Sequence, residues 1–139
     1  MTLVGTQIEP PVNRFGFESG QVVQEFGWDD DVDDALRLAI EDVTGEELAD
    51  EDYGDVADSV IIWWRSDDGD LTDMLVDALN MLDDGGAVWL LTRKAGRDGH
   101  VPHNEIEDAA TTAGLHAMMT FAAGDDWSAT KLGNRGRGR

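Results

Sequence analysis

The stretch QVVQEFGWDD (residues 21–30) decides the fold class of this chain. It predicts a buried strand running directly into a helix, the place where a nucleotide-binding α/β protein carries a glycine-rich phosphate loop. Such a loop needs several glycines, so that backbone N–H groups can approach a phosphate in front of a helix. Here Gly27 is the one glycine, followed by Trp28 and a run of aspartates. Since carboxylates at a helix N-terminus repel a phosphate, the sequence predicts a nucleotide-binding scaffold with a filled binding loop.

Alternating strand and helix patterns surround this stretch. The apolar runs at residues 59–64 and 87–91 predict strands buried on both faces. Apolar residues at helical spacing predict helices over residues 32–43, 71–82 and 106–113. The first helix is expected to begin at the aspartates at its start and to end at Gly45. The second is expected to begin at Asp70, with Asp73, and to end at Gly85-Gly86, and the third to run from Asn104 to Gly114.

The C-terminal part predicts a hairpin, with residues 116–121 and 127–132 as antiparallel strands. The resulting order predicts one α/β domain over residues 18–132, with a mostly parallel sheet, a C-terminal antiparallel hairpin and helices on both faces. Residues 1–17 are expected to form a flexible arm, and residues 133–139 a disordered basic tail. Residues 46–55, with six carboxylates, are read as a solvated loop that could hide a short edge strand near Glu47-Leu48.

The chain has 139 residues, no cysteine and a net charge of −20. The charge is uneven, since residues 1–92 sum to −21 and residues 93–139 to +1. Such an acidic field disfavours nucleic acid and membranes and favours a protein partner with a basic surface, although it could also serve solubility alone. With no long apolar run and no signal peptide, the sequence predicts a soluble, cytoplasmic protein.

Several of these segments resemble known families. The Gly27 turn, DSVII (58–62) and LDDGGAVWL (82–90) resemble the Rossmann-like methyltransferases. More closely, the chain is similar to actinobacterial members of domain-of-unknown-function family 3052, although Arg93 stands where that family commonly has proline. This resemblance implies a small Rossmann-like fold, and the family has no established activity. The segments that carry it are GQVVQEFGW (20–28), EDY (51–53), WWR (63–65), WLLT (89–92), KAGR (94–97), TAGL (112–115) and DWS (126–128).

The methyltransferase resemblance places Glu25 and Gly27 at the first acidic residue and first glycine of the cofactor turn. Trp28 and Asp29 replace the small residues that let S-adenosylmethionine lie against the backbone, so no cofactor is predicted. If one does bind, the candidate residues are Glu25, Gly27, Trp28 and Thr92.

The loop RKAGRDG (93–99) is the basic cluster inside the domain. Because it follows a strand, it is expected at the carboxyl edge of the sheet, where ligands of open α/β folds bind. Arg93, Lys94 and Arg97 could bind an anion or an acidic partner, or could pair with the protein's own acidic surface. Trp127 is expected to be partly exposed, as an interface residue. Trp63 and Trp64 are expected in the core.

Metal and catalytic sites find little support in the sequence. His100, His103 and His116 are read as ordinary surface residues rather than metal ligands. Asp29, Asp31 and Asp33 alternate as in a calcium loop, but Asp34 and Ile40 stand where that loop needs glycine and glutamate. No cysteine nucleophile or serine elbow is present, so no catalytic residue is predicted.

Three functions remain open. The first is a non-catalytic acidic regulatory or adaptor protein that contacts other proteins. The second is a small-molecule sensor, or a methyltransferase-like enzyme, that binds S-adenosylmethionine or a nucleotide beside Gly27 and Thr92. The third is mimicry of nucleic acid by residues 29–42, with Asp30, Asp34 and Glu41 as outward acids.

Overall fold

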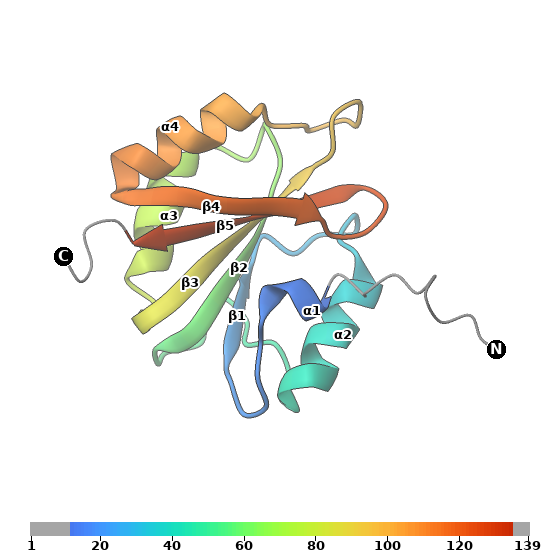
Figure 1. The fold of residues 1–139 in the computed structure, drawn as a ribbon, viewed down its shortest axis with the longest axis vertical. Helices are drawn as coiled ribbons and strands as arrows, with labels where there is room; N and C mark the ends of the chain where they lie inside the picture. Colours follow the sequence, from blue (N-terminus) through green and yellow to red (C-terminus); the bar gives the residue numbers. More distant parts are fainter. Residues whose placement is uncertain (1–11, 135–139) are drawn as a thin grey trace.

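The computed structural model describes residues 12–134 and contains one five-stranded sheet (Figure 1). The strand order is β1-β2-β3-β5-β4; β1, β2 and β3 are parallel, and β5 is antiparallel to both of its neighbours. The α/β class, the parallel strands and the C-terminal hairpin are therefore confirmed. The elements are α1 (Val12–Phe15), β1 (Val23–Phe26), α2 (Asp34–Thr44), β2 (Ala57–Trp64), α3 (Leu71–Leu79), β3 (Leu82–Arg93), α4 (His103–Ala113), β4 (Leu115–Ala122) and β5 (Trp127–Asn134).

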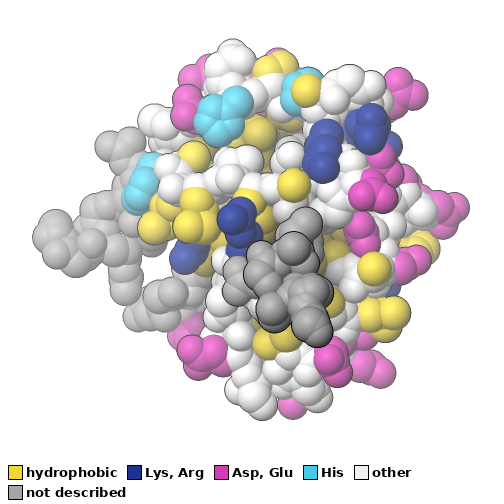
Figure 2. Space-filling model, turned by 45° about the vertical axis from the view of Figure 1, so that its right-hand side comes forward, with side chains coloured by type: hydrophobic (Ala, Val, Ile, Leu, Met, Phe, Trp, Pro, Cys, Tyr) yellow, Lys and Arg dark blue, Asp and Glu magenta, His cyan; other side chains and the backbone are white. Residues whose placement is uncertain are grey.

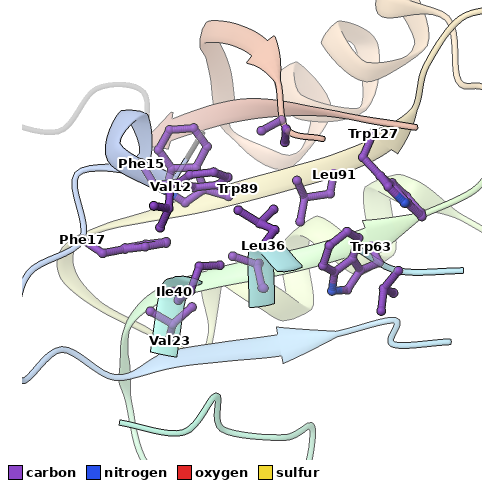
Figure 3. Close-up of a cluster of buried hydrophobic side chains, with 14 of the residues drawn as sticks. Val12, Phe15, Phe17, Val23, Leu36, Ile40, Trp63, Trp89, Leu91 and Trp127 are labelled. Carbon is purple, nitrogen blue, oxygen red and sulfur yellow. The ribbon is translucent and has the colours of Figure 1, made fainter. Parts of the chain in front are cut away.

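Helices cover both faces of the sheet, as predicted. The α1 and α2 face holds an aromatic-rich core, in which Trp63 and Trp89 are fully buried side chains (Figure 3). The α3 and α4 face holds a second core around Val60, Ile62 and Leu90. Trp63 and Trp64 belong to opposite cores, which confirms the prediction of a strand buried on both faces.

The expected ends of α2 are confirmed, and those of α3 and α4 need correction. Asp33 accepts a hydrogen bond from the Leu36 N–H (3.0 Å), and Gly45 ends α2 with a φ of 76°. Asp70 begins α3 as predicted, but α3 ends at Leu79 and the glycine pair lies inside β3. A side chain at Gly86 would meet the Asp58 carbonyl oxygen, so close strand packing explains that glycine. In α4, Pro102 rather than Asn104 is the N-cap.

The N-terminal boundary also moves. Val12, Phe15 and Phe17 are buried, and the Phe15 ring lies 4.5 Å from that of Trp89, so residues 12–17 belong to the domain rather than to a flexible arm. The Phe15 ring also packs against Phe121 of β4 at 5.2 Å, in the same core to which α2 contributes Leu36 and Ile40. The other residues predicted as arm or tail, 1–11 and 135–139, lie outside the described part, and β5 continues to Asn134.

The acidic stretch at residues 46–55 runs beside β1. The Glu25 N–H donates to the Ala49 carbonyl (2.8 Å), and the Ala49 N–H donates to the Val23 carbonyl (2.9 Å). This single parallel bridge lies one residue beyond the expected edge strand at Glu47-Leu48. Within residues 12–134, no helix is long and apolar enough to cross a membrane.

Candidate functional site at the carboxyl edge of the sheet

The segments that follow β1, β2 and β3 meet at one edge of the sheet, because parallel strands end on the same side. The β1 turn contributes Gly27 and Asp31, the end of β2 contributes Arg65, and the end of β3 contributes Arg93. We refer to Glu25, Gly27, Asp31, Arg65, Arg93 and Trp127 as the carboxyl-edge cluster.

Glu25 is buried, with 7 % of its side chain exposed, and is held from two sides. Arg37 of α2 binds it through both guanidinium arms, with Nε at 2.7 Å from Oε2 and Nη2 at 2.9 Å from Oε1. The Trp63 indole N–H also donates to Oε2, at 2.8 Å. These three bonds occupy both carboxylate oxygens, and burial behind α2 keeps solvent from them.

Gly27 has both backbone polar groups bonded inside the protein. Its N–H donates to Glu51 Oε2 (3.0 Å), and its carbonyl accepts from Arg65 Nη1 (2.8 Å). Its φ is 79°, and a side chain here would overlap the Trp63 carbonyl oxygen. Close packing of the turn against β2 therefore requires glycine at this position.

Arg65 and Arg93 converge on Asp31 above Trp127. Arg65 binds both Asp31 oxygens, and Arg93 Nη1 lies 3.4 Å from Oδ2. Both guanidinium groups also contact the Trp127 ring, with centroid distances of 5.3 and 5.1 Å. The hydrogen bond from Arg65 lowers the pKa of Asp31 despite partial burial, and the bond to Asp31 raises the pKa of Arg65.

This lowered pKa gives an acid-dependent prediction. Asp31 stabilises the folded protein while it is ionised, so its contribution is present above its ordinary pKa of 3.8 and is lost as pH falls through the lower folded value. Asp31→Asn should cost about 1 kcal/mol at pH 7, since Asp31 is 39 % exposed and solvent screens the pair.

Urea unfolding of both proteins from pH 7 to pH 3 measures this difference. The difference in free energy of unfolding between the native protein and Asp31→Asn should stay constant down to about pH 4 and decrease below it. A difference in free energy of unfolding that does not change over this pH range would contradict an ion pair at Asp31.

Of the four residues predicted as candidates for cofactor binding, Thr92 lies apart from Gly27 and Trp28 in the structure. Gly27 and Trp28 line a hollow of about 280 Å³ with Glu51, Arg65 and other residues of this edge, and Trp28 is 52 % exposed. Thr92 lines a different hollow, of about 220 Å³, on the α4 face. Gly27 and Thr92 therefore line two different hollows among the described residues.

The basic loop at residues 93–99 pairs largely with acidic residues of the protein itself, which was one of the two interpretations of the sequence. Arg93 pairs with Asp31, and Arg97 Nε lies 2.7 Å from Asp126 Oδ1. Lys94 has no carboxylate partner among the described residues. The expectation for Trp127 is wrong: it is 1 % exposed, packed against the Trp63 ring at 4.9 Å, and its indole N–H donates to the Asp31 carbonyl (3.0 Å). Its hairpin position brings it under both arginines.

The acids proposed as outward residues differ in their surroundings. Asp30 and Asp34 are exposed, and Asp34 also contacts Arg37 at 3.5 Å. Glu41 is half-buried and accepts a hydrogen bond from the Leu48 N–H (2.9 Å), so it is not an outward acid. The reason is that the chain after α2 folds back over it.

The histidines are placed near α4 and β4 without forming a metal site. His103 pairs with Glu107 (3.1 Å), and the His100 ring donates from Nδ1 to the Arg93 carbonyl (3.0 Å). Among residues 12–134, no group of three His, Cys, Asp or Glu side chains could hold a metal ion.

Arg37, Glu51 and Arg65 are central to the site and were not predicted from sequence. Arg37 and Arg65 are two of only three basic residues in the first 92, a signal that could have directed attention to them. Glu51 is one of six acids in its loop, so no sequence signal distinguishes it.

The comparisons with known proteins agree with this architecture. The family model described as Protein of unknown function (DUF3052) matches residues 12–136. The chain belongs to this family. An uncharacterised protein of Mycobacterium tuberculosis (strain ATCC 25618 / H37Rv) is 47 % identical over 119 residues, which cover 86 % of this chain and 75 % of the relative. An uncharacterised Mycobacterium bovis protein has the same identity and coverage.

Solved structures, several of them of methyltransferases, share the fold of this family member. A TehB-like SAM-dependent methyltransferase from Corynebacterium glutamicum superposes with a TM-score of 0.55 at 11 % identity, covering 94 % of this chain and 91 % of that one. The pyocyanin biosynthetic protein PhzM gives 0.67 at 11 % identity, covering 88 % and 53 %. At such low identity these similarities establish the methyltransferase-like Rossmann fold alone.

Proposed function

We propose that this chain is a non-catalytic regulatory or adaptor protein that uses a methyltransferase-like scaffold as a binding platform. One observation carries the proposal: the Glu25 carboxylate and both backbone polar groups of Gly27 are bonded within the protein. Glu25 is held by Arg37 and Trp63, and Gly27 by Glu51 and Arg65.

These contacts do not fit S-adenosylmethionine, which is bound in some of the similar methyltransferase structures. A cofactor against this turn would need a free carboxylate and an accessible backbone. Binding would therefore require the Glu25–Arg37 pair to open and Arg65 to leave the Gly27 carbonyl. Breaking a buried ion pair costs about 3–5 kcal/mol, which would cancel about half of the roughly 8 kcal/mol of a micromolar affinity.

The outward face of α2 offers a surface for a protein partner. Asp34, Leu38 and Asp42 are spaced four residues apart and are all exposed, with Leu38 exposed by 66 %. Figure 2 shows acidic side chains spread along one side of the molecule, with apolar side chains among them. An apolar residue between two acids suits a basic partner that has an apolar recess, with Leu38 filling the recess.

A direct test measures cofactor binding by isothermal titration with S-adenosylmethionine and S-adenosylhomocysteine. We expect no saturable heat. Micromolar binding that Arg65→Ala strengthens would overturn the proposal, because it would show that the closed edge opens for a cofactor.

A second test places a photo-crosslinking amino acid at Leu38 and, as a control, at Val76, which is 43 % exposed on α3. In cytosol from cells that express the chain natively, Leu38 should capture one saturable partner that Val76 does not. Asp34→Asn with Asp42→Asn should remove that capture. Two results would overturn the adaptor role: equal capture from Leu38 and Val76, or capture from Leu38 that the two aspartate substitutions do not reduce.

The hollow beside Trp28 favours a second candidate, a small-molecule sensor. It has about 280 Å³ of space and a half-exposed indole that could stack on a ring. A nucleotide that raises the melting temperature in the native protein and not in Trp28→Ala would support the sensor over the adaptor.

A further inference from the structure

The hollow on the α4 face differs in charge from the rest of this acidic protein. Its volume is about 220 Å³, roughly seven times the share of one water molecule in the liquid. Its lining includes Lys94, His100 and His103 but no Asp or Glu, whereas carboxylates line the hollows beside Gly27 and beside α3. On the face drawn in Figure 2, histidine side chains and Lys or Arg side chains lie in the upper and middle parts of the molecule, with Asp and Glu side chains beside them.

Hydroxyl groups from three adjacent strands form the floor of this hollow. Thr92 of β3 pairs with Ser128 of β5, and Thr130 of β5 pairs with Thr120 of β4. Thr120 and Thr130 are hydrogen-bonded to each other through their hydroxyls (3.1 Å). Thr92 is 3 % exposed, yet its hydroxyl has no hydrogen-bond partner among residues 12–134. In this part of the chain the fully buried side-chain polar atoms without a partner are Gln24 Oε1 and Arg93 Nε, so the Thr92 hydroxyl is accessible from the hollow and can bond to a molecule there.

The N-terminus of α4 borders the same hollow. This helix has eleven residues and no side-chain cap, because Pro102 occupies the N-cap position. The structure gives no hydrogen bond to the backbone N–H of His103 or Asn104 in its described part. Uncapped N–H groups at a helix N-terminus attract anions.

Lys94 is available to complete the site. Its backbone N–H donates to the Asp126 carbonyl (2.9 Å), which places the residue at the rim, and its amine forms no ion pair with a described carboxylate. The nearest basic neighbours differ, since Arg93 and Arg97 both pair with aspartates.

From these contacts we infer that the hollow between Thr92, Lys94 and the α4 N-terminus binds a small anion that carries a phosphate group. A phosphate has several acceptor oxygens, which match an amine, two or more hydroxyls and helix N–H groups arranged around one space. The lining holds no carboxylate and includes Lys94, which reduces the repulsion of an anion; Glu107, which pairs with His103 (3.1 Å), lies outside the lining. This site is separate from the α2 surface, so either proposal can fail alone.

The test titrates ¹⁵N-labelled full-length protein with inorganic phosphate, glycerol phosphate and acetate, with sodium chloride holding the ionic strength constant. Saturable shifts of the His103, Asn104 and Thr92 amides with the two phosphates are expected. Thr92→Val and Lys94→Gln should each weaken binding about tenfold, since each removes a hydrogen bond to a charged group. Lys131→Gln is the matched control, because Lys131 lies over the Trp89 ring on the opposite face.

Three outcomes overturn the inference. Shifts no larger than those of chloride would show that no anion site exists, and equal affinity in Thr92→Val and Lys94→Gln would place binding elsewhere. Acetate binding more tightly than phosphate would contradict the phosphate class.

Protein stability offers a readout that is independent of binding. Thr92→Val should leave the urea midpoint unchanged or raise it, because the lost hydroxyl has no internal partner. A clearly lower midpoint would show that the hydroxyl is bonded within the protein and would contradict its role as a ligand-binding group.

Discussion

Glu25→Ala is expected to lower the free energy of unfolding by about 3 kcal/mol, near the lower end of the range for one partner of a buried ion pair. The substitution leaves the Arg37 guanidinium without its bidentate partner and the Trp63 indole N–H without an acceptor. The Arg37 side chain is 28 % exposed, so water recovers part of the loss. Urea unfolding followed by tryptophan fluorescence measures the change.

Glu47→Ala serves as the control, because Glu47 is exposed and its substitution should change stability by less than about 0.5 kcal/mol. Glu25→Gln should fall between the two, since the amide oxygen can still accept from Trp63. If Glu25→Ala matched Glu47→Ala, the carboxylate would be free of Arg37 in solution. Glu25 would then no longer support the proposal that the carboxyl edge of the sheet is closed to a cofactor.

Gly27→Ala is expected to lower the free energy of unfolding by at least about 3 kcal/mol, from two separate causes. The left-handed backbone at φ 79° costs any other residue about 1–2 kcal/mol. The added methyl group would also overlap the Trp63 carbonyl oxygen, so the turn and β2 would have to move apart.

Gly45→Ala measures the cost of the backbone angle alone, so the difference between the two variants gives the cost of the overlap with Trp63. Gly45 has nearly the same φ, 76°, and no atom lies within 4 Å of where its side chain would begin. Its substitution should cost about 1 kcal/mol. Equal losses in the two variants would show that Gly27 is needed for its backbone angle alone, and that the turn does not press against β2.

The secondary structure was predictable where local patterns carry the physics. Buried parallel strands have continuous apolar runs, and the segment from Ser59 to Trp64 has no competing helical period. The α2 ends were predictable because Asp33 and Gly45 satisfy backbone groups of their own helix. Gly85-Gly86 misled the prediction of the α3 end, because at Gly86 the requirement comes from the distant Asp58 carbonyl.

The candidate site was predictable only in part. Glu25, Gly27 and Trp28 stand in one short segment, so their common location at the end of β1 follows from the chain itself. Trp127 and Arg65 are 62 positions apart, and no local pattern indicates that one covers the other. Sequence reasoning therefore placed Trp127 at the surface, whereas the hairpin carries it under two arginines.

The sequence by itself determined the α/β class, the family, the order of strands and helices along the chain, and the departure of the Gly27 turn from a phosphate-binding loop. These follow from hydrophobic period, glycine position and charge, which act over a few residues. Only the tertiary structure decided that β5 lies between β3 and β4, that Arg37 and Arg65 close the carboxyl edge, and that Thr92 faces a hollow without carboxylates. The reason is that pairing across the sheet joins residues far apart in sequence, where contact geometry rather than local preference selects the partner.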